Sequence, residues 1–514
     1  MTTKTSKTFF VTTPIYYVND VPSIGHAYTT FAADALARFH RLNEENVFFL
    51  TGLDENSTKT VQAAKAKGLE GREQIQRYAD EMAVTWKNAW ASLGVTNDGF
   101  IRTTAPEHAA VVNDFYAKVK SKGDVYKGVY EGLYCEGCEA FVSENDLVDG
   151  KCPLHNKHPK VLKEDNYFFK LTRYADAVLT HIQANPDFIK PETRRNEVVS
   201  FIKAGLKDVS VSRPNQGWGI PLPDDETQCF WVWFDALLNY FSGAPGKWPA
   251  DVQLMAKDII KFHCVIWPAM LISAGAPLPR TIVAHGFLTV NGQKMSKSLG
   301  NAIDPIALSK KYSTDALRYF LFREISFGSD GDFSEKGLVE RHDSELANAF
   351  GNFAYRSLSF INAKTDSMIP EIASASLTPA DEEFKKKTDA LAETVAKEFE
   401  ACELKNAVDA SMRFADECNR YFNAREPWTL FKGSGTAPVE ARNVLALSGR
   451  AAYALALALA PITPNASKKV FDCFGSAKPV WGDLTPAASG AKLEKPEIVV
   501  PKLAPDEKKK KQLT

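Results

Sequence analysis

The stretch "TFFVTTPIYYVNDVPSIGHAYTTFAADALARFHRLNEENVFFLTG", residues 8–52, decides the fold. Its opening TFFVTT is rich in β-forming residues, and PIYYVNDVPS has the composition of a loop. GHAYTTFAADALARFHRL carries apolar residues at helical spacing, and VFFLTG is typical of a short buried strand. Strand, loop, helix and strand in this order predict a parallel sheet with crossover helices.

The same alternation returns later in the chain. QCFWVWFDALLNYF and KDIIKFHCVIWPAML each predict a strand followed by a helix, and RTIVAHGFLTV predicts a final strand. Between residues 121 and 226 the sequence pattern changes to predicted turns, cysteines and short strands, which indicates an insertion. From about residue 334 to 487 the pattern is almost wholly helical and predicts a helix bundle.

Size and composition exclude several classes of protein. A chain of 514 residues is long enough for about two to four domains. A net charge of −1 gives no overall field for nucleic acid or membranes, although a local basic face can still bind RNA. The apolar run AAYALALALAPI, residues 451–462, is too short to span a bilayer and predicts a buried helix. Eight cysteines in such a chain indicate no disulfide framework, so we expect a reducing, cytoplasmic location.

The loop PSIGHAYTT, residues 22–30, joins the first strand to a long helix. Gly25 allows a ligand to approach the backbone, and free N–H groups at the helix start favour an anion. His26 can donate a hydrogen bond to a phosphate oxygen. Taken alone, a Gly-His pair at this place is equally compatible with simple helix capping.

A second loop, FLTVNGQKMSKSLGN at residues 287–301, places Lys294 and Lys297 among serines and between glycines. A hinged cationic loop suits an anionic ligand that is bound briefly and then released, and triphosphate is the obvious candidate. The alternative is a pair of solvated loop charges.

The insertion carries YCEGCEAFVSENDLVDGKCPLH. Cys135 and Cys138 form a CxxC turn, and Cys152 with His155 forms a CxxH turn, which together predict a closed, structural zinc site. His158 is an alternative fourth ligand, although the pairing of Cys152 with His155 is more symmetric. Unligated thiols are the remaining alternative.

Together, SIGH and KMSKS resemble the HIGH and KMSKS signatures of class I aminoacyl-tRNA synthetases. With the zinc-binding insertion and segments such as WGIPLP, VWFDALLNYF and AHGFLTVNGQKMSKSLGN, the chain resembles methionyl-tRNA synthetases over about residues 8–485. The insertion is much shorter than the editing insertion usual in the leucine, isoleucine and valine enzymes. The resemblance implies a methionine–tRNA ligase that uses ATP with Mg²⁺ to form methionyl-adenylate and transfers methionine to the 3′-terminal adenosine of tRNA(Met).

The resemblance also implies roles for individual residues. The expected catalytic residues are His26, Lys294 and Lys297. The expected ATP-binding residues are Ser23, Gly25, His26, Lys294, Ser296, Lys297 and Ser298. The expected methionine-binding residues are Ile15, Tyr17, Asp54, Trp233, Ala236, Leu237, Tyr240, Phe262 and His263. Asp54 suits the substrate ammonium, and aromatic rings suit a polarizable thioether.

On the helical part, Asn352 and Arg356 lie one helical turn apart, and REPWTLF supplies Trp428. The resemblance implies that these three residues read the anticodon, because an indole can stack on a splayed base whose edge the other two bond. Without the resemblance, ordinary bundle packing would be the preferred interpretation.

The sequence departs from the family pattern at three sites. Ser23 stands where the family usually has the first histidine of its HIGH motif. DENS, residues 54–57, stands where relatives often have aspartate, a variable residue, histidine and glycine. Leu237 replaces a proline found in some relatives, so that wall of the pocket is expected to differ in shape.

The expected fold is an α/β Rossmann-type catalytic core with a zinc-knuckle insertion, followed by an all-α helical-bundle anticodon-binding domain. The expected divisions are the two Rossmann halves (1–120 and 227–285), the insertion (121–226), the KMSKS loop with a stem-contact region (286–340), the anticodon domain (341–487) and a flexible tail (488–514). A monomer without a membrane association is expected. The alternatives are an adenylate-forming nucleotidyl transferase that uses no tRNA, and a catalytically impaired RNA-binding paralogue.

Overall fold

The computed structural model describes residues 7–142, 144, 147–153, 156–290, 292–295, 302–431 and 438–503. The chain forms two compact units. The α/β unit comprises Thr8–Ala33 and Val47–Gly286, and the helical unit comprises Met1–Lys7, Asp34–Asn46 and Phe287–Thr514. Helix α1, Ile24–Leu42, gives its first turns to the α/β unit and its last turns to the helical unit.

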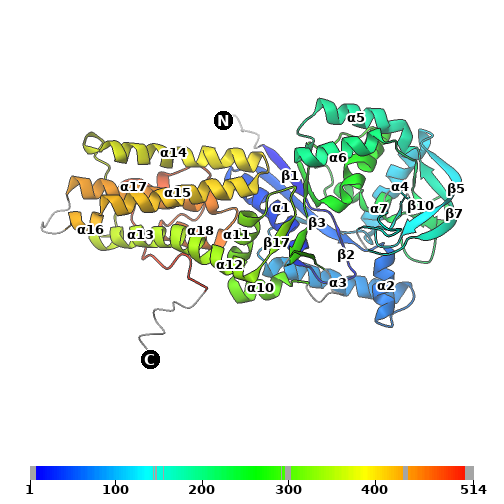
Figure 1. Ribbon diagram of the computed structural model, residues 1–514, viewed down its shortest axis with the longest axis horizontal. Helices are drawn as coiled ribbons and strands as arrows, with labels where there is room; N and C mark the ends of the chain where they lie inside the picture. The colour runs from blue at the N-terminus through cyan, green and yellow to red at the C-terminus, as the bar shows by residue number, and fades with distance from the viewer. Residues whose placement is uncertain are drawn as a thin grey trace. The chain divides into compact units, whose positions relative to one another are not determined.

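A sheet of seven strands forms the centre of the α/β unit (Figure 1). The strand order is β2-β3-β1-β13-β14-β8, with β4 beside β3, and the pairs β1–β13, β13–β14, β14–β8, β2–β3 and β3–β4 are parallel. The strands are β1 Thr8–Thr12, β2 Tyr16–Tyr17, β3 Asn46–Asp54, β4 Gly99–Arg102, β8 Ile189–Lys190, β13 Val252–Ala256 and β14 Thr281–His285. The predicted parallel sheet is therefore confirmed.

Strand β1 is the point where the strand order reverses. The chain runs from β1 to β3 and β4 on one side, and later to β13 and β14 on the other. In open parallel sheets, ligands bind outside the carboxyl ends of the strands at such a point. The loops that follow β1, β3 and β13 therefore define the edge at which the functional site is expected.

Helices surround this sheet. They are α2 Thr58–Ala66, α3 Arg72–Ser92, α4 Pro106–Ser121, α5 Ala175–Ala184, α6 Glu192–Lys203, α7 Val232–Ala236, α8 Asn239–Ser242 and α9 Trp267–Ala274. Buried side chains from most of these helices, from Val112 on α4 to Met270 on α9, join one apolar core with residues of the strands. Helices α5 and α6 lie within residues 121–226, where the sequence indicates turns and short strands. Only a few of their positions are apolar and buried, such as Val178 and Val198, so their periodicity is weak.

Residues 125–230 also form two smaller antiparallel sheets. The first has the order β6-β5-β7-β9, and the second β10-β12-β11. The strands are β5 Val125–Cys135, β6 Ala140–Val142, β7 Lys160–Phe169, β9 Val209–Ser210, β10 Ser212–Pro214, β11 Pro221–Leu222 and β12 Asp225–Phe230. The strand predicted in QCFW is thus present as β12, but it belongs to a small sheet rather than to the central one.

The prediction of a strand at the start of KDIIKFHCVIWPAML is wrong. Strand β13 ends at Ala256, just before this segment, which forms a short 3₁₀ turn at Lys257–Ile259, a π-helical turn at Phe262–Ile266 and then α9. A short apolar run does not distinguish a buried strand from a buried helix. Here Pro268 in the first turn of α9 favours the helix.

The helical unit contains the predicted bundle, in which α13, α14, α15, α17 and α18 lie side by side (Figure 1). Its helices are α10 Pro305–Tyr312, α11 Thr314–Glu324, α12 Glu335–Arg341, α13 Asn352–Lys364, α14 Pro379–Glu400, α15 Leu404–Arg425, α16 Pro427–Leu430, α17 Val439–Leu459 and α18 Pro464–Cys473. The apolar run 451–462 falls mostly in α17 and is buried, as predicted. Among the described residues, no helix has both the length and the apolar composition needed to cross a membrane.

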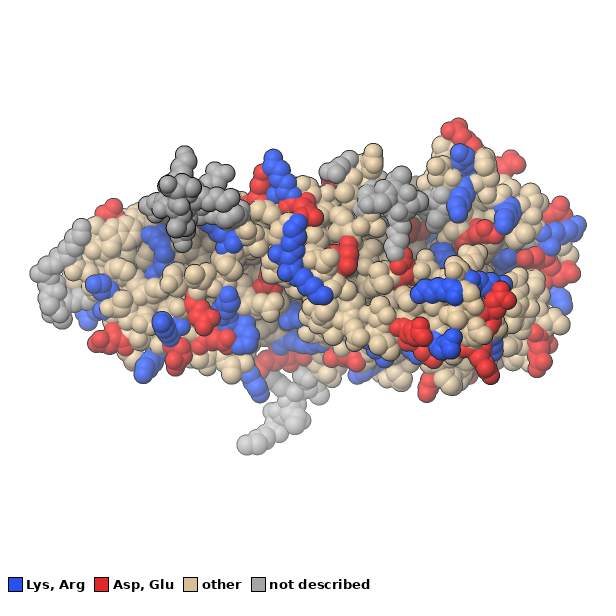
Figure 2. All heavy atoms as spheres, turned by 90° about the horizontal axis from the view of Figure 1, so that it is seen from below, with Lys and Arg blue, Asp and Glu red and all other residues tan. Residues whose placement is uncertain are grey.

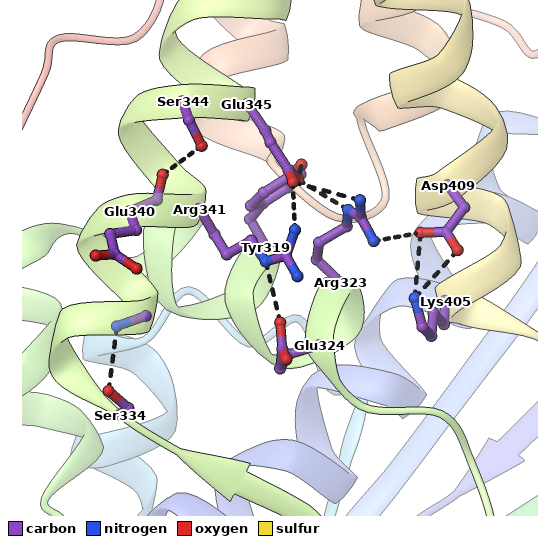
Figure 3. A network of polar contacts seen from close by, with 11 residues as sticks. Tyr319, Arg323, Glu324, Ser334, Glu340, Arg341, Ser344, Glu345, Lys405 and Asp409 are labelled. Carbon is purple, nitrogen blue, oxygen red and sulfur yellow. Dashed lines mark hydrogen bonds and ion pairs between the residues drawn. The ribbon is translucent and has the colours of Figure 1, made fainter.

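A polar network joins α11, α12 and α15 within the helical unit (Figure 3). Arg323 pairs with Glu345 at 2.8 Å and with Asp409 at 3.0 Å. Arg341 pairs with the same Glu345 at 2.6 Å, and the hydroxyl of Tyr319 donates to it at 2.6 Å. Glu345 lies in a π-helical segment, His342–Gly351, that leads directly into α13. The network therefore fixes the start of the helix that carries Asn352 and Arg356.

The expected flexible tail at 488–514 needs correction. Leu493, Val499 and Val500 are buried, the N–H of Glu494 donates to the carbonyl of Cys473, and the N–H of Leu503 donates to Asp343. Residues 488–503 therefore pack onto the helical unit. Proline, glycine and lysine in this stretch suggested disorder, but scattered apolar residues supply its contacts. Residues 504–514 lie outside the described part of the chain.

Candidate functional site

His26 lies in the first turn of α1, beyond the carboxyl end of β1. Its Nδ1 accepts a hydrogen bond from the backbone N–H of Ser23 at 3.0 Å, and the Ser23 hydroxyl lies 3.1 Å from the same atom. Because Nδ1 is an acceptor, the ring hydrogen is on Nε2. Burial lowers the pKa of His26 to about 4, so the ring is neutral near pH 7. His26 is thus held as a neutral donor, with its ring edge-on to Tyr16 at 5.0 Å and to Trp86 at 5.2 Å.

Asp54 ends strand β3 and is buried, with 4% of its surface exposed. Its Oδ1 has no hydrogen-bond partner among the described residues. Burial raises the pKa of this carboxyl well above its ordinary value, the charges of Glu139 and Asp235 raise it further, and Lys59 lowers it. A buried acceptor without a donor is costly in a folded protein, so this atom suits a cationic ligand group.

Lys59 and Glu139 complete the charged surroundings of Asp54. The ammonium of Lys59 lies 3.7 Å from the centre of the Tyr17 ring, and Tyr17 is the register partner of Asp54. Glu139 accepts from the hydroxyl of Thr58 at 2.6 Å and from the backbone N–H of Lys59 at 3.2 Å. The carboxyl groups of Glu139, Asp235 and Glu55 surround Asp54 with only the ammonium of Lys59 to oppose them, so a further positive charge at Asp54 would be favourable.

An aromatic wall lies in the same unit. Trp233 on α7 stacks on Phe262 with ring centres 3.8 Å apart. His263 accepts from the hydroxyl of Tyr240 at 2.8 Å through Nε2, and its Nδ1 donates to the carbonyl of Ile259 at 3.1 Å. Burial lowers the pKa of His263 to about 4, so this ring is also neutral near pH 7.

The structure brings most of the expected methionine-binding residues to one core. Trp233, Leu237 and Tyr240 belong to the buried apolar cluster, and Ile15, Tyr17 and Phe262 pack against it. Ala236 is buried on α7 between them in sequence. Ile15 and Tyr17 follow the carboxyl end of β1 and Phe262 follows that of β13, the edge at which ligands bind in open parallel sheets. The other residues lie on or between α7 and α8, which precede β13 in the chain.

The sulfur atoms of Cys135, Cys138 and Cys152 lie within 4.8 Å of one another. Burial raises the pKa of the Cys138 thiol, and the two neighbouring cysteines raise it further. A divalent cation would lower the pKa of these thiols by stabilising their thiolate forms, so the cluster fits a zinc ion. His155, the expected fourth ligand, lies outside the described residues. His158 is not part of the cluster, and its Nδ1 instead lies 2.9 Å from the carbonyl of Gly150.

The candidate zinc knuckle, which is the segment that carries Cys135, Cys138 and Cys152, is hydrogen-bonded directly to the aromatic wall. The carbonyl of Cys138 accepts from the indole N–H of Trp233 at 3.3 Å, and the carbonyl of Glu139 accepts from that of Trp231 at 2.7 Å. The backbone of the knuckle therefore holds two indoles, one of which is an expected pocket residue.

The KMSKS loop starts from a hairpin of β15 Leu288–Val290 and β16 Gln293–Lys294, with β17 Gly331–Phe333 beside β15. Gly292 turns the hairpin with φ of +73°, and its N–H donates to Asp332 at 2.8 Å. Lys294 belongs to β16, but its side chain lies outside the described part. Ser296, Lys297 and Ser298 lie outside it altogether, so their expected contacts with a nucleotide stay predictions.

The expected anticodon residues lie on the bundle. Arg356 lies 5.8 Å from the centre of the Trp428 ring and 5.4 Å from that of Phe422, and it donates to Asn423 at 3.2 Å. Asn352 is exposed at the first residue of α13, one turn before Arg356. On the face drawn in Figure 2, Lys and Arg side chains are interspersed with Asp and Glu, and neither sign forms one continuous patch.

Comparison with known proteins places this geometry in a family. A family model described as "tRNA synthetases class I (M)" matches residues 9–158 and 142–358, and one described as "Anticodon binding domain of methionyl tRNA ligase" matches residues 369–513. The chain belongs to the methionyl-tRNA synthetase family. The methionine–tRNA ligase of Thermotoga maritima is 43% identical over 478 residues, which are 90% of this chain and 74% of that protein. The chloroplastic/mitochondrial methionine–tRNA ligase of Arabidopsis thaliana is 40% identical and covers 93% of this chain and 79% of its own length.

Solved structures of the methionyl-tRNA synthetase family have the same fold as this chain. The Mycobacterium tuberculosis methionyl-tRNA synthetase in complex with methionyl-adenylate has a TM-score of 0.92 and 38% identity, and covers 96% of this chain and 100% of its own. The free form of the same enzyme has a TM-score of 0.83 and 35% identity, and covers 98% of this chain and 100% of its own. The predicted class I fold with a helical anticodon-binding domain is thereby confirmed.

The departures from the methionyl-tRNA synthetase pattern make contacts in the fold. Asn56 donates to Asp235 at 2.7 Å and to the carbonyl of Thr103 at 3.0 Å. Ser57 caps α2 by accepting from the N–H of Thr60 at 3.3 Å. Ser23 holds His26. Ser23, Asn56 and Ser57 therefore each have a local partner, and Leu237 is buried in the apolar core.

The sequence offers little signal for Lys59 and Glu139. Glu139 directly follows the CxxC turn, but nothing in its neighbourhood indicates that its carboxylate reaches the start of α2. That contact depends on the folding of the insertion against the central sheet. A charged residue five positions after Asp54 is likewise common on helix surfaces.

Proposed function

We propose that this chain is a methionine–tRNA ligase that activates methionine with ATP and transfers it to the 3′-terminal adenosine of tRNA(Met). Similarity to methionine–tRNA ligases over most of the chain supports the activity. The observation that carries the choice of substrate is the buried Oδ1 of Asp54 beside Tyr17, which no described residue hydrogen-bonds, in the unit that also holds the Trp233–Phe262 wall.

In this proposal the methionine ammonium binds Asp54 and the side chain lies against the aromatic wall. Trp233, Phe262 and Tyr240 present ring surfaces to the thioether, for which sulfur–aromatic contacts are favourable. The neutral His263 holds the hydroxyl of Tyr240. A site that holds both the ammonium and the thioether selects amino acids by the length of their side chain as well as by its polarity.

The activation step joins two anions. The methionine carboxylate attacks the α-phosphorus of ATP, the bond to the bridging oxygen breaks and pyrophosphate leaves. Catalysis therefore depends on positioning and charge neutralisation. His26, held neutral with hydrogen on Nε2, donates to a phosphate oxygen, and Gly25 leaves the start of α1 open. Lys294 and Lys297, with Ser296 and Ser298, neutralise the leaving pyrophosphate, and Mg²⁺ accompanies the ATP substrate.

The zinc ion in this proposal is structural and is held by Cys135, Cys138, Cys152 and His155. Asn352, Arg356 and Trp428 contact the anticodon of tRNA(Met), where the indole stacks on a base. The protein is proposed to act as a monomer in the cytoplasm. Sedimentation of the purified protein tests the oligomeric state.

Two assays test the function. Methionine-dependent exchange of labelled pyrophosphate into ATP is expected from the ligase and not from a catalytically impaired paralogue. Charging of tRNA(Met) is expected from the ligase and not from a nucleotidyl transferase that stops at the adenylate. Lys297→Ala is expected to slow exchange far more than it weakens methionine binding, and an equal loss of both would contradict the role of the loop.

A further inference from the structure

A chain of four polar side chains runs beside the candidate methionine pocket. Asn56 donates to Oδ2 of Asp235 at 2.7 Å, and Nε2 of His108 donates to Oδ1 of the same carboxylate. Nδ1 of His108 lies 2.7 Å from the hydroxyl of Ser242. Asp235, His108 and Ser242 are buried, and Asn56 is partly buried. We call these four residues the polar relay.

The polar relay joins elements that carry the pocket. Asn56 follows Asp54 by two positions, Asp235 lies on α7 between Trp233 and Ala236, and Ser242 lies on α8, two positions after Tyr240. His108, on α4, connects α7 to α8. The relay therefore sets where α7 and α8 lie relative to the end of strand β3.

Both amide hydrogens of Asn56 are used. One is directed at Asp235 and the other at the backbone carbonyl of Thr103, 3.0 Å away. A histidine, which relatives often have at this place, carries at most one hydrogen on each ring nitrogen and cannot serve two acceptors from one atom. Asparagine is therefore suited to hold Asp235 and the loop after β4 together.

The Ser242–His108–Asp235 arrangement has the order of groups found in nucleophilic hydrolases, but it does not serve that chemistry here. Ser242 is buried, and its hydroxyl also lies near the carbonyls of Leu238 and Asn239, at 3.3 and 3.4 Å. A nucleophile must reach its substrate, and this hydroxyl faces backbone. The arrangement therefore serves to hold α7 and α8.

We infer that Asn56 and His108 are positioning residues that select methionine by fixing α7, and with it Trp233, at a set distance from Asp54. The inference rests on the proposed function. The substrate bridges two walls, an ammonium site on β3 and a thioether site on α7, and the polar relay is a direct polar link between them. Loosening it should weaken binding of methionine and admit amino acids of other lengths, while ATP binding stays unchanged.

The test compares variants in the methionine-dependent exchange assay. Asn56→Leu keeps the shape of the side chain but removes both donors, and His108→Gln is a second variant at the next link. Each is expected to raise KM for methionine about tenfold, as a small misplacement of a binding group does, and to leave kcat and KM for ATP nearly unchanged. The preference for methionine over leucine and norleucine, measured as the ratio of kcat/KM values, is expected to fall.

The controls separate positioning from simple loss of structure. Asn56→His, which restores one donor, is expected to recover most of the methionine KM and the preference. Asn185→Leu is the matched control, because Asn185 is exposed and bonds mainly within its own helix. Thermal unfolding of each variant shows whether it is folded.

An unchanged methionine KM and preference in both Asn56→Leu and His108→Gln overturn the inference while leaving the proposed function intact. Equal losses in kcat, in KM for ATP and in KM for methionine, without recovery in Asn56→His, overturn it as well. A wild-type protein without methionine-dependent exchange overturns the proposed function, and the inference with it.

Discussion

At the scale of the residue, function follows from polar atoms that the fold leaves unpaired or holds in one state. Oδ1 of Asp54 is buried without a partner among the described residues, and His26 is held as a neutral donor. Ser23, which departs from the family's first histidine, makes its contact through its backbone N–H as well as its hydroxyl. That contact explains how a serine can stand there without disturbing His26.

The raised pKa of Asp54 predicts a dependence of methionine binding on pH. Protonation of Asp54 removes the partner of the ammonium, and the protonated fraction grows as pH falls through the raised pKa of the free enzyme. KM for methionine is therefore expected to increase as pH falls, by up to about tenfold per unit below that pKa. Exchange kinetics between pH 8 and pH 5.5 measure this.

Asp54→Asn is the control for that measurement. It is expected to lower kcat/KM for methionine by about a hundredfold or more, because the buried counter-charge is lost. Its KM for methionine should no longer depend on pH in this range, and KM for ATP should be unchanged. A pH dependence that persists in Asp54→Asn would assign the titration to another group.

At the scale of the element, the segment that carries Cys135, Cys138 and Cys152 holds two tryptophan side chains outside itself. The carbonyls of Cys138 and Glu139 accept from the indoles of Trp233 and Trp231. An element inserted into the α/β unit thus bonds the aromatic wall that we propose faces the substrate. In the proposed function, this connection links the metal to methionine binding.

Removal of the metal is expected to disturb Trp233. Cys152→Ser should lower the zinc content of the purified protein, shift the tryptophan emission and raise KM for methionine, while the helical unit keeps its circular dichroism. Cys473→Ser is the matched control, because Cys473 is a buried thiol outside the cluster. Loss of zinc with unchanged emission and unchanged KM would show that the knuckle does not position the indole.

A substitution on helix α16 is expected to impair the charging of tRNA without affecting pyrophosphate exchange. Trp428→Ala is expected to reduce kcat/KM for charging of tRNA(Met) by about ten- to a hundredfold, because stacking of one base on an aromatic ring contributes roughly 1–3 kcal/mol. Pyrophosphate exchange, which needs no tRNA, should be unchanged. Val439→Ala, an exposed apolar residue at the start of α17, is the control. A parallel decrease in exchange would contradict the assigned role.

At the scale of the whole molecule, Arg318 holds the helical unit together. Its guanidinium is fully buried, pairs with Asp34 of α1 at 2.7 Å, and donates to the carbonyls of Pro461 and Ile462 between α17 and α18 at 2.8 and 2.9 Å. Three parts of the chain that are far apart in sequence meet at this one side chain. The part of α1 that belongs to the helical unit is thereby anchored at Asp34.

Arg318→Met is expected to destabilise the helical unit by about 3–5 kcal/mol, because Asp34 is left buried with less compensation for its charge. Denaturant unfolding followed by circular dichroism measures this. The double variant with Asp34→Leu should recover part of the loss, since an apolar pair replaces a buried ion pair at little cost. No recovery would mean that the carbonyl contacts of Arg318 dominate.

Local patterns account for most of what could be predicted. The helical spacing of α1 and of the bundle, the helix start near Gly25 and the spacing of Cys135, Cys138 and Cys152 are all short-range features of the sequence. The strand in KDII was wrongly predicted because a short apolar run suits either a strand or a buried helix. The sequence predicts a flexible tail for residues 488–503 because no local pattern shows that their few apolar residues find partners in distant helices.

The sequence by itself determined the parallel α/β core, the helical bundle, the cysteine cluster and the family, because each depends on residue types at fixed local spacings. Only the tertiary structure decided that Glu139 reaches α2, that Asn56 and His108 hold Asp235, and that Arg318 is buried against Asp34. It also decided that Oδ1 of Asp54 is buried without a hydrogen bond from any residue that the structure describes. These contacts join residues far apart in the chain. Their geometry depends on how strands order themselves and how inserted elements fold back, which no local pattern encodes.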